Sequence, residues 1–156
     1  MHNALAPVEI NISGSIIDKH ILNKFQHTPY MKKVLIVDDN SDILWVVETI
    51  LKRYGFEVLT TLRGEEVMAK TKKHNPQLIL LDVFLSGVDG IEVCNLLKSN
   101  PETKDIPIIM FSAHTNFNDV MKFCRADDFV TKPFDTNELV KKINYQIEHH
   151  PVTYTS

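Results

Sequence analysis

Five short apolar runs alternate along this chain with five segments whose apolar residues recur at helical spacing, and this alternation limits the possible folds most strongly. The apolar runs predict strands over residues 34–37, 56–60, 77–81, 106–111 and 128–131. The other segments predict helices over residues 41–54, 65–74, 89–99, 118–125 and 135–147. Continuous apolar strands between helices are typical of a parallel sheet covered on both faces. We therefore expect the α/β class, with a doubly wound, five-stranded parallel sheet of (βα)5 type.

Residues at the expected helix ends support these boundaries. Asp89 with Glu92, and Asp135 with Glu138, have the spacing of capping boxes, which mark helix starts. Gly55 follows the first expected helix, and glycine tolerates the left-handed backbone with which many helices end.

The first thirty residues differ from the rest of the chain and predict a separate extension. Residues 1–13 are polar and lack a clear period, while residues 15–25 could form one short helix. That helix would serve as a partner-binding or dimerising element, or the whole segment would be a loose extension; the marginal stability of short isolated helices favours the extension. We expect residues 1–30 to be partly disordered or a short helix, residues 31–150 to form the folded domain, and residues 151–156 to be a tail.

Composition excludes several classes of protein. The 156-residue chain has a formal net charge of −3, and no motif interleaves basic and aromatic residues, so we expect no direct nucleic-acid partner. Its apolar runs are too short to cross a bilayer, and its start lacks the layout of a signal peptide, so no membrane partner is expected.

Cysteine and histidine usage points to no disulfide scaffold and no transition-metal site. Cys94 and Cys124 are far apart and form no CxxC motif, so a reduced, cytoplasmic setting with two small buried side chains is the simpler interpretation. His149 and His150 are adjacent and have no partner at metal-ligand spacing.

Polar residues of a distinctive kind stand where four of the expected strands end. Asp38 and Asp39 follow the first strand, Asp82 the third, Ser112 the fourth and Lys132 the fifth. Each alone has an ordinary alternative as a cap or turn residue. Because ligands bind beyond the carboxyl ends of parallel strands, we expect all five side chains to gather at one edge of the sheet.

The chemistry of these residue types favours magnesium and phosphoryl transfer. Clustered carboxylates repel one another, so they bind protons or a cation, and a small set of oxygen ligands suits Mg²⁺. A carboxylate can attack phosphorus to give an acyl phosphate, and Lys132 and Mg²⁺ would neutralise charge during the transfer. The chain has no glycine-rich phosphate loop, so no motif supports nucleotide binding.

Four segments carry a resemblance to a known family: VLIVDDN at 34–40, LILLDVFLSGVDG at 78–90, IIMFSAH at 108–114 and ADDFVTKPF at 126–134. In order and spacing, residues 31–148 resemble the receiver domain of two-component response regulators. The resemblance implies the flavodoxin-like topology of that family. It also implies a stand-alone receiver, since no output-domain motif is present.

The resemblance implies a role for each strand-end residue. Asp82 would be the phosphoacceptor, and Mg²⁺ would be held by Asp38, Asp39, Asp82 and the backbone carbonyl of Phe84. Ser112 and Lys132 would contact the phosphoryl group.

A second implied set of features concerns the switch. Phe129 would be the aromatic residue whose rotamer follows Ser112, and the Lys132–Pro133 peptide would be cis.

Two positions depart from the family pattern, and two more leave its consequence open. Ser86 stands where proline is usual, which predicts a looser loop without the loss of a ligand. Arg125 stands where glycine is usual, which predicts a reshaped end of the fourth helix and a changed output surface. Phe84 and His114 would flank the phosphate and affect its lifetime, although His114 could equally be a plain loop residue.

The function that follows from the resemblance is that of a single-domain response regulator. It would accept a phosphoryl group on Asp82 from a histidine kinase or phosphotransfer protein. It would then signal through a phosphorylation-dependent surface to a downstream protein, or pass the group on. It would not be an enzyme beyond Mg²⁺-assisted self-phosphorylation and autodephosphorylation, and would be a monomer or weak homodimer.

Two alternatives stay open from the sequence. One is a receiver used as a binding module without phosphorylation, although all the expected acid, hydroxyl and lysine positions are filled. The other is a Mg²⁺-dependent aspartyl phosphatase, which would need a second acid where Phe84 stands. Trp45, on the first expected helix, would be a surface aromatic or a kinase-docking contact.

Overall fold

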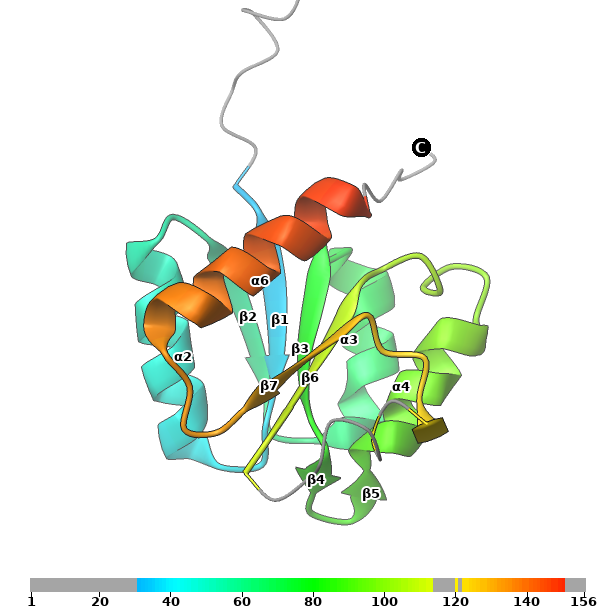
Figure 1. The fold of residues 1–156 in the computed structure, drawn as a ribbon. Coiled ribbons are helices and arrows are strands. Elements are labelled where there is room, and N and C mark those ends of the chain that lie inside the picture. Colours follow the sequence, from blue (N-terminus) through cyan, green and yellow to red (C-terminus); the bar gives the residue numbers. More distant parts are fainter. Residues whose placement is uncertain (1–30, 114–119, 121, 151–156) are drawn as a thin grey trace, which may run out of the picture. The chain divides into compact units, whose positions relative to one another are not determined.

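The computed structural model describes residues 31–113, 120 and 122–150, and a parallel sheet forms its centre (Figure 1). The strands are β1 (Lys33–Val37), β2 (Glu57–Thr61), β3 (Leu78–Asp82), β6 (Ile108–Ser112) and β7 (Asp128–Thr131). They lie in the order β2-β1-β3-β6-β7, and every neighbouring pair is parallel. The chain winds outward from β1 in both directions, which confirms the predicted doubly wound, flavodoxin-like sheet.

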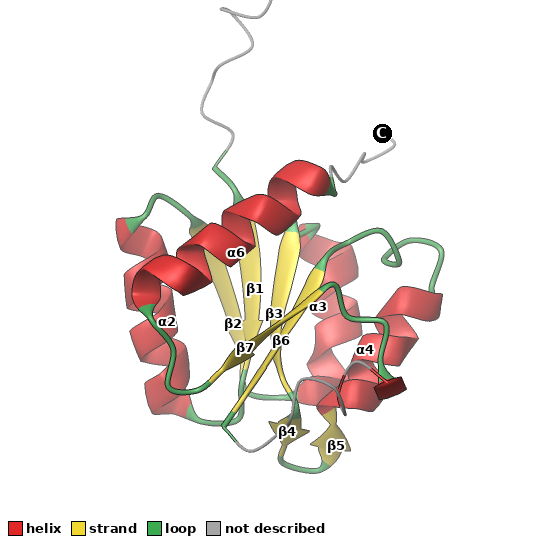
Figure 2. Cartoon of the chain, viewed as in Figure 1, coloured by secondary structure: helices red, strands yellow, loops and turns green. Residues whose placement is uncertain are grey.

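In the part of the chain that the structure describes, four complete α-helices and one short 3₁₀ helix surround the sheet (Figure 2). They are α2 (Ser41–Arg53), the 3₁₀ helix η1 (Gly64–Glu66), α3 (Val67–His74), α4 (Gly90–Ser99) and α6 (Thr136–His149). Residues 118, 119 and 121 of the helix predicted over residues 118–125 lie outside the described residues, while positions 120, 122 and 123 are helical and positions 124 and 125 are not. None of the described helices is long and apolar enough to span a membrane.

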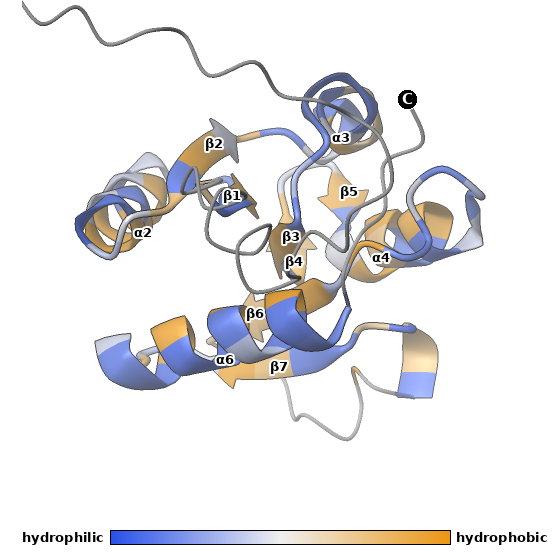
Figure 3. Ribbon diagram, turned by 90° about the horizontal axis from the view of Figure 1, so that it is seen from above, coloured by the Kyte–Doolittle hydropathy of each residue, from blue (hydrophilic) through white to orange (hydrophobic). Residues whose placement is uncertain are grey.

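The helices divide between the two faces of the sheet, as the continuous apolar strands predicted. Alternate side chains of a strand point to opposite faces. Val34 and Ile36 therefore pack in one core with residues of α2 and α6, and Leu35 and Val37 pack in another with residues of α3 and α4. Figure 3 looks down on this arrangement, with the apolar sides of the helices turned to the sheet. Because helices cover both faces of the sheet, a polar site has to lie at the ends of the strands.

Helix caps agree with most of the predicted boundaries. The Asp89 side chain accepts a hydrogen bond from Ile91 N, and the Asp135 side chain accepts one from Glu138 N at 2.9 Å. Gly55 ends the first helix with a φ of +85°. The single helix predicted over residues 65–74 is wrong in detail, because the chain first makes η1 and then α3.

A small hairpin after β3 was not predicted. It pairs β4 (Phe84–Leu85) with β5 (Val88–Asp89) in antiparallel fashion, and Gly87 turns it with a φ of +84°. Gly90 then begins α4 so close to β3 that a Cβ there would collide with the carbonyl oxygen of Asp82. Gly90 N also donates to Val83 O at 2.9 Å. These contacts fold the segment after Asp82 back against the end of β3.

Candidate functional site

An open pocket of about 380 Å³ lies at the carboxyl edge of the sheet. The strand ends supply the residues that the sequence grouped together: Asp38, Asp39, Asp82, Ser112 and Lys132. Asn40, Ile43, Phe84 and Ala113 complete the lining. The structure therefore brings all five predicted side chains to one pocket, because the strands are parallel and end at the same edge.

The loop between β1 and α2 fixes Asp38 in the floor of this pocket. The Asp38 side chain is 1% exposed, and its Oδ1 accepts a hydrogen bond from Asn40 N at 2.8 Å. Asn40 in turn caps α2, since its side chain accepts hydrogen bonds from Asp42 N and Ile43 N. The short connection between β1 and α2 thus fixes the Asp38 side chain, because Asn40 bonds both Asp38 and the start of α2.

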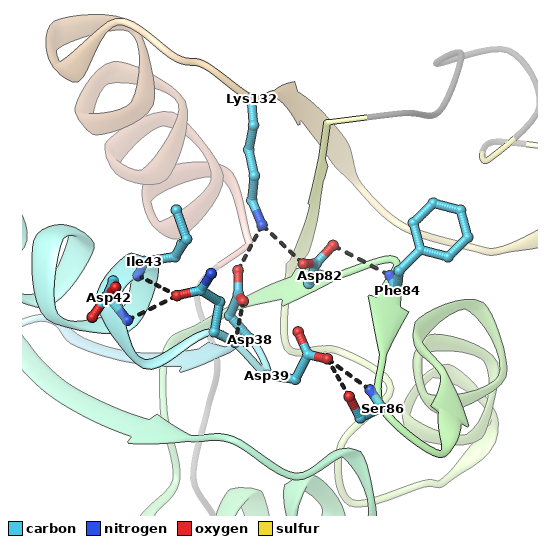
Figure 4. A network of polar contacts seen from close by, with 9 residues as sticks. Asp38, Asp39, Asp42, Ile43, Asp82, Phe84, Ser86 and Lys132 are labelled. Carbon is cyan, nitrogen blue, oxygen red and sulfur yellow. Dashed lines mark hydrogen bonds and ion pairs between the residues drawn. The ribbon is translucent and has the colours of Figure 1, made fainter.

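Lys132 joins two of the carboxylates (Figure 4). Its Nζ lies 2.6 Å from Asp38 Oδ2 and 2.8 Å from Asp82 Oδ2, and 4.0 Å from the centre of the Phe111 ring. The backbone N of Lys132 donates to Ser112 O at 2.9 Å, which fixes the base of the side chain. The Lys132–Pro133 peptide is cis, as predicted.

Asp82 occupies the carboxyl end of β3 with one side exposed to the pocket. Its side chain accepts hydrogen bonds through both oxygens: Oδ1 from Phe84 N at 3.2 Å and Oδ2 from Lys132. Asp82 as a whole is 7% exposed, and it lies in the pocket lining, within reach of a small solute. This carboxylate is therefore oriented by its neighbours and still accessible.

The electrostatic balance of the pocket favours a cation. Oxygen atoms of Asp38, Asp39 and Asp82 all lie within 4.8 Å of one another, and Lys132 contacts two of them. Burial raises the pKa of Asp38 above its ordinary value, although hydrogen bonds from Lys132 and Asn40 N act in the opposite direction. Three carboxylates of this kind fit the oxygen ligands that Mg²⁺ prefers.

Ser112 and Phe129 lie on neighbouring strands. Ser112 ends β6, is almost fully buried and lines the pocket, while Phe129 lies in β7 within the core on the α3 and α4 side. In the parallel pairing Met110 is opposite Phe129 and Ser112 is opposite Thr131. The two residues predicted as a switch are thus one strand apart, with Phe129 outside the pocket lining.

Ser86 contributes to the site in a way that the sequence did not predict. Its backbone N and its Oγ both donate to Asp39 Oδ2, at 3.0 Å and 2.5 Å (Figure 4). Serine in place of proline predicted a looser loop at this position, but the loop is hydrogen-bonded to Asp39. The sequence shows that serine is unusual at this position, but only the folded structure shows that its hydrogen-bond partner is Asp39.

Trp45 and Arg125 do not line the pocket. Trp45 is 68% exposed and lines a separate groove with Glu48 and Leu62. His114 lies outside the described residues. Arg125 is exposed and does not adopt a left-handed backbone, since Asn75 is the one described non-glycine residue with positive φ.

Cys94 and Cys124 are buried and free, as predicted. A hydrogen bond between the two thiols is the main cause of opposite shifts, raising the pKa of Cys94 and lowering the pKa of Cys124 to about 7. Both lie in the core on the α3 and α4 side of the sheet, and neither lines the pocket of the carboxylates.

Comparison with known proteins agrees with this geometry. Residues 34–144 match the family model of the response regulator receiver domain. The protein PilG of Pseudomonas aeruginosa is 33% identical over 117 residues, which cover 74% of this chain and 87% of PilG. The phosphate regulon transcriptional regulatory protein PhoB of Rhizobium meliloti is 37% identical over 115 residues, 72% of this chain, but this match spans only 51% of PhoB.

A solved structure extends the likeness to three dimensions. The chemotaxis protein CheY4 of Vibrio cholerae superposes with a TM-score of 0.69 at 31% identity, covering 74% of this chain and 98% of the other. The family match, the sheet order and the acidic pocket agree. This chain therefore belongs to the response regulator receiver domain family of two-component signal transduction, and is a signalling module rather than a conventional enzyme.

Proposed function

We propose that Asp82 accepts a phosphoryl group and that this chain is a phosphorylation-dependent switch. The observation that carries the proposal is the position of Lys132 Nζ, which bonds Asp82 Oδ2 and Asp38 Oδ2 at once in an open pocket. An Asp82 oxygen would attack phosphorus, the bond from phosphorus to the donor's leaving group would break, and an acyl phosphate would form.

Lys132 would neutralise charge on both sides of this step. Before transfer it balances the Asp82 carboxylate. After transfer, the Asp82 carboxylate has become the neutral acyl part of an acyl phosphate, and the phosphoryl oxygens carry the negative charge instead. Because the Lys132 side chain already reaches the pocket from β7, a small movement would bring its Nζ to the new oxygens. Positioning and charge neutralisation of this kind are the main requirements of phosphoryl transfer.

Mg²⁺ is the cofactor that this donor set suits. Asp38, Asp39, Asp82 and the carbonyl of Phe84 would hold it, and it would supply further positive charge next to the phosphoryl oxygens. The closeness of three carboxylates supports this proposal, since a cation relieves their repulsion.

The readout would pass through β6 and β7. We infer that the Ser112 hydroxyl turns toward the phosphoryl group and that Phe129 follows, changing the surface near β7 and α6. Couplings of this kind are typically about 1–3 kcal/mol, which shifts a population of conformations rather than the fold.

Receiver domains work with histidine kinases, and we propose a histidine kinase or phosphotransfer protein as the donor here. Residues 31–150 would form the switch, with residues 1–30 as an extension and 151–156 as a tail. The high coverage of PilG and CheY4 supports a stand-alone receiver acting on a downstream protein, as a monomer or weak homodimer. The free cysteines support a cytoplasmic setting.

A phosphorylation assay tests the proposal. Purified protein is incubated with acetyl phosphate and Mg²⁺, and its intact mass is measured with time. We expect the mass to increase by one phosphoryl group. No increase should occur when a chelator is added before acetyl phosphate. Asp82→Asn should abolish the gain, whereas Asp42→Asn, at an exposed acid in the first turn of α2, should preserve it.

Two results would contradict the proposal. Failure of wild type to be modified, together with no spectral change on adding beryllium fluoride and Mg²⁺, would favour a binding module that needs no phosphorylation. Multiple turnover of a phosphoester would favour an aspartyl phosphatase, although Phe84 stands where such an enzyme needs its second acid.

A further inference from the structure

We propose that Ser86 is a positioning residue for Mg²⁺, which acts by holding the carboxylate of Asp39. The inference rests on the proposed function, because it concerns the metal that the pocket would bind. Its own basis is a pair of hydrogen bonds, from Ser86 N and Ser86 Oγ to Asp39 Oδ2.

Asp39 needs such support more than the other two carboxylates do. Asp38 is buried and bonded to Lys132 and Asn40 N, and Asp82 is buried and bonded to Lys132 and Phe84 N. Asp39 is exposed, and the hydrogen bonds that its carboxylate accepts among the described residues come from two atoms of Ser86. Without Ser86, this side chain would be free to rotate toward solvent.

The two hydrogen bonds also determine which oxygen is offered to a metal. Both donors meet the same atom, Oδ2, so the carboxylate is held from the side of the β4–β5 hairpin. In Figure 4 the other oxygen of Asp39 points toward Asp38 and Asp82. Ser86 thus occupies one oxygen and leaves the second directed into the pocket, where the three carboxylates lie within 4.8 Å.

Fixing a ligand before the metal arrives should tighten binding. A free carboxylate loses rotational freedom when it binds a metal, and a carboxylate already held loses less. Partners that orient metal ligands typically change metal affinity by about 10- to 100-fold when removed. Because Ser86 is exposed, we expect values at the low end of that range.

Position 86 allows the two hydrogen bonds to be removed one at a time. Ser86→Thr keeps both donors, Ser86→Ala keeps only the backbone N–H, and Ser86→Pro keeps neither. Proline has no N–H to donate, so the residue usual in the family cannot make either contact. The prediction is therefore a graded series rather than a single loss.

Calorimetric titration of the full chain with MgCl₂ tests the series. We expect Ser86→Thr to match wild type and Ser86→Pro, which removes both hydrogen bonds, to bind Mg²⁺ about 10-fold more weakly. Ser86→Ala, which removes one of the two, should fall between them. Ser99→Ala removes a hydroxyl that donates to Asn95 O on α4, away from the pocket, and should leave Mg²⁺ affinity unchanged. Thermal melting in a chelator establishes that each variant is folded.

The rate of phosphorylation by acetyl phosphate separates positioning from chemistry. We expect Ser86→Ala and Ser86→Pro to raise the Mg²⁺ concentration needed for half-maximal rate and to keep the rate at saturating Mg²⁺. Equal or tighter Mg²⁺ binding by folded Ser86→Ala and Ser86→Pro would overturn the role of Ser86 and leave the proposed function standing. A wild type that binds no Mg²⁺ would overturn the metal site itself, and the inference with it.

Discussion

The two edges of the sheet each contain a lysine bound to an aspartate, but their surroundings differ. At the amino edge, Lys98 Nζ lies 2.6 Å from Asp127 Oδ2, and the same oxygen accepts a hydrogen bond from Ile108 N at 2.7 Å. Lys98 Nζ also donates to Ile106 O at 2.9 Å. At the carboxyl edge, one lysine faces three carboxylates, and the pocket beside them is open.

The difference separates a structural ion pair from a functional site. At the amino edge one lysine meets one aspartate, backbone groups supply further hydrogen bonds to both, and His150 Nε2 lies 3.8 Å from Asp127 Oδ1. At the carboxyl edge negative charge is in excess, and burial raises the pKa of Asp38. Such an arrangement costs stability, and sites that bind a cation or a phosphoryl group commonly have that property.

The largest effect should come from breaking the amino-edge pair. Lys98→Ala leaves Asp127 in a site where the two side chains are only 8% and 17% exposed. We expect the free energy of unfolding to fall by about 3 kcal/mol, the cost of an uncompensated buried charge. Urea unfolding followed by circular dichroism measures this.

Lys104→Ala, at an exposed lysine nearby, is the matched control and should change stability by less than about 0.5 kcal/mol. If both variants lost the same amount, the amino-edge pair would be no more structural than a surface charge.

The next effect, from Lys132→Ala, should be smaller and depend on metal. Without Mg²⁺ we expect a loss of about 1–2 kcal/mol, because removal of the long Lys132 side chain opens a space between the two buried carboxylates that water from the open pocket can fill. Mg²⁺ should then stabilise this variant more than wild type, since the competing lysine is gone. Thermal melting at increasing Mg²⁺ concentrations checks this. An equal stabilisation of Lys98→Ala by Mg²⁺ would contradict the distinction between the two edges.

Asp38→Asn should have the opposite sign and stabilise the metal-free protein by about 1 kcal/mol at neutral pH. Between the unfolded pKa of about 4 and the raised pKa in the fold, the folded state binds more protons, so stability falls as the pH rises through that window. Asp38→Asn has no carboxylate to ionise, so its stability should not fall in this way. Below the window its stability should equal that of wild type. Unfolding titrations across pH test the sign.

Asp127→Asn provides the contrast, because it should destabilise by weakening the pair with Lys98. A gain in stability from both asparagine variants would remove the distinction between the edges.

The smallest effect should come from the outer pair at the amino edge. Lys142 Nζ lies 2.7 Å from Asp128 Oδ1, with side chains 28% and 19% exposed. We expect Lys142→Ala to cost about 0.5 kcal/mol and the cost to shrink in high salt, as for other solvent-accessible pairs. Denaturant unfolding at low and high salt measures this, and a loss as large as that of Lys98→Ala would show that burial does not set the difference.

Much of the site could be predicted because its residues stand at strand ends. The apolar runs fixed the strands, and parallel pairing then brought Asp38, Asp82 and Lys132 together without further information. The hairpin of β4 and β5 could not be predicted in the same way. Its strands have two residues each, too few to show a period.

The amino-acid sequence alone determined the alternation of strands and helices, because hydrophobic periodicity is a local property of neighbouring residues. It also determined which polar residues end the strands. Only the tertiary structure decided that Ser86 bonds Asp39, 47 positions away, and that Gly90 lies against the carbonyl of Asp82. Those contacts depend on how separate segments pack, and no local pattern encodes a distance between segments that meet only after folding.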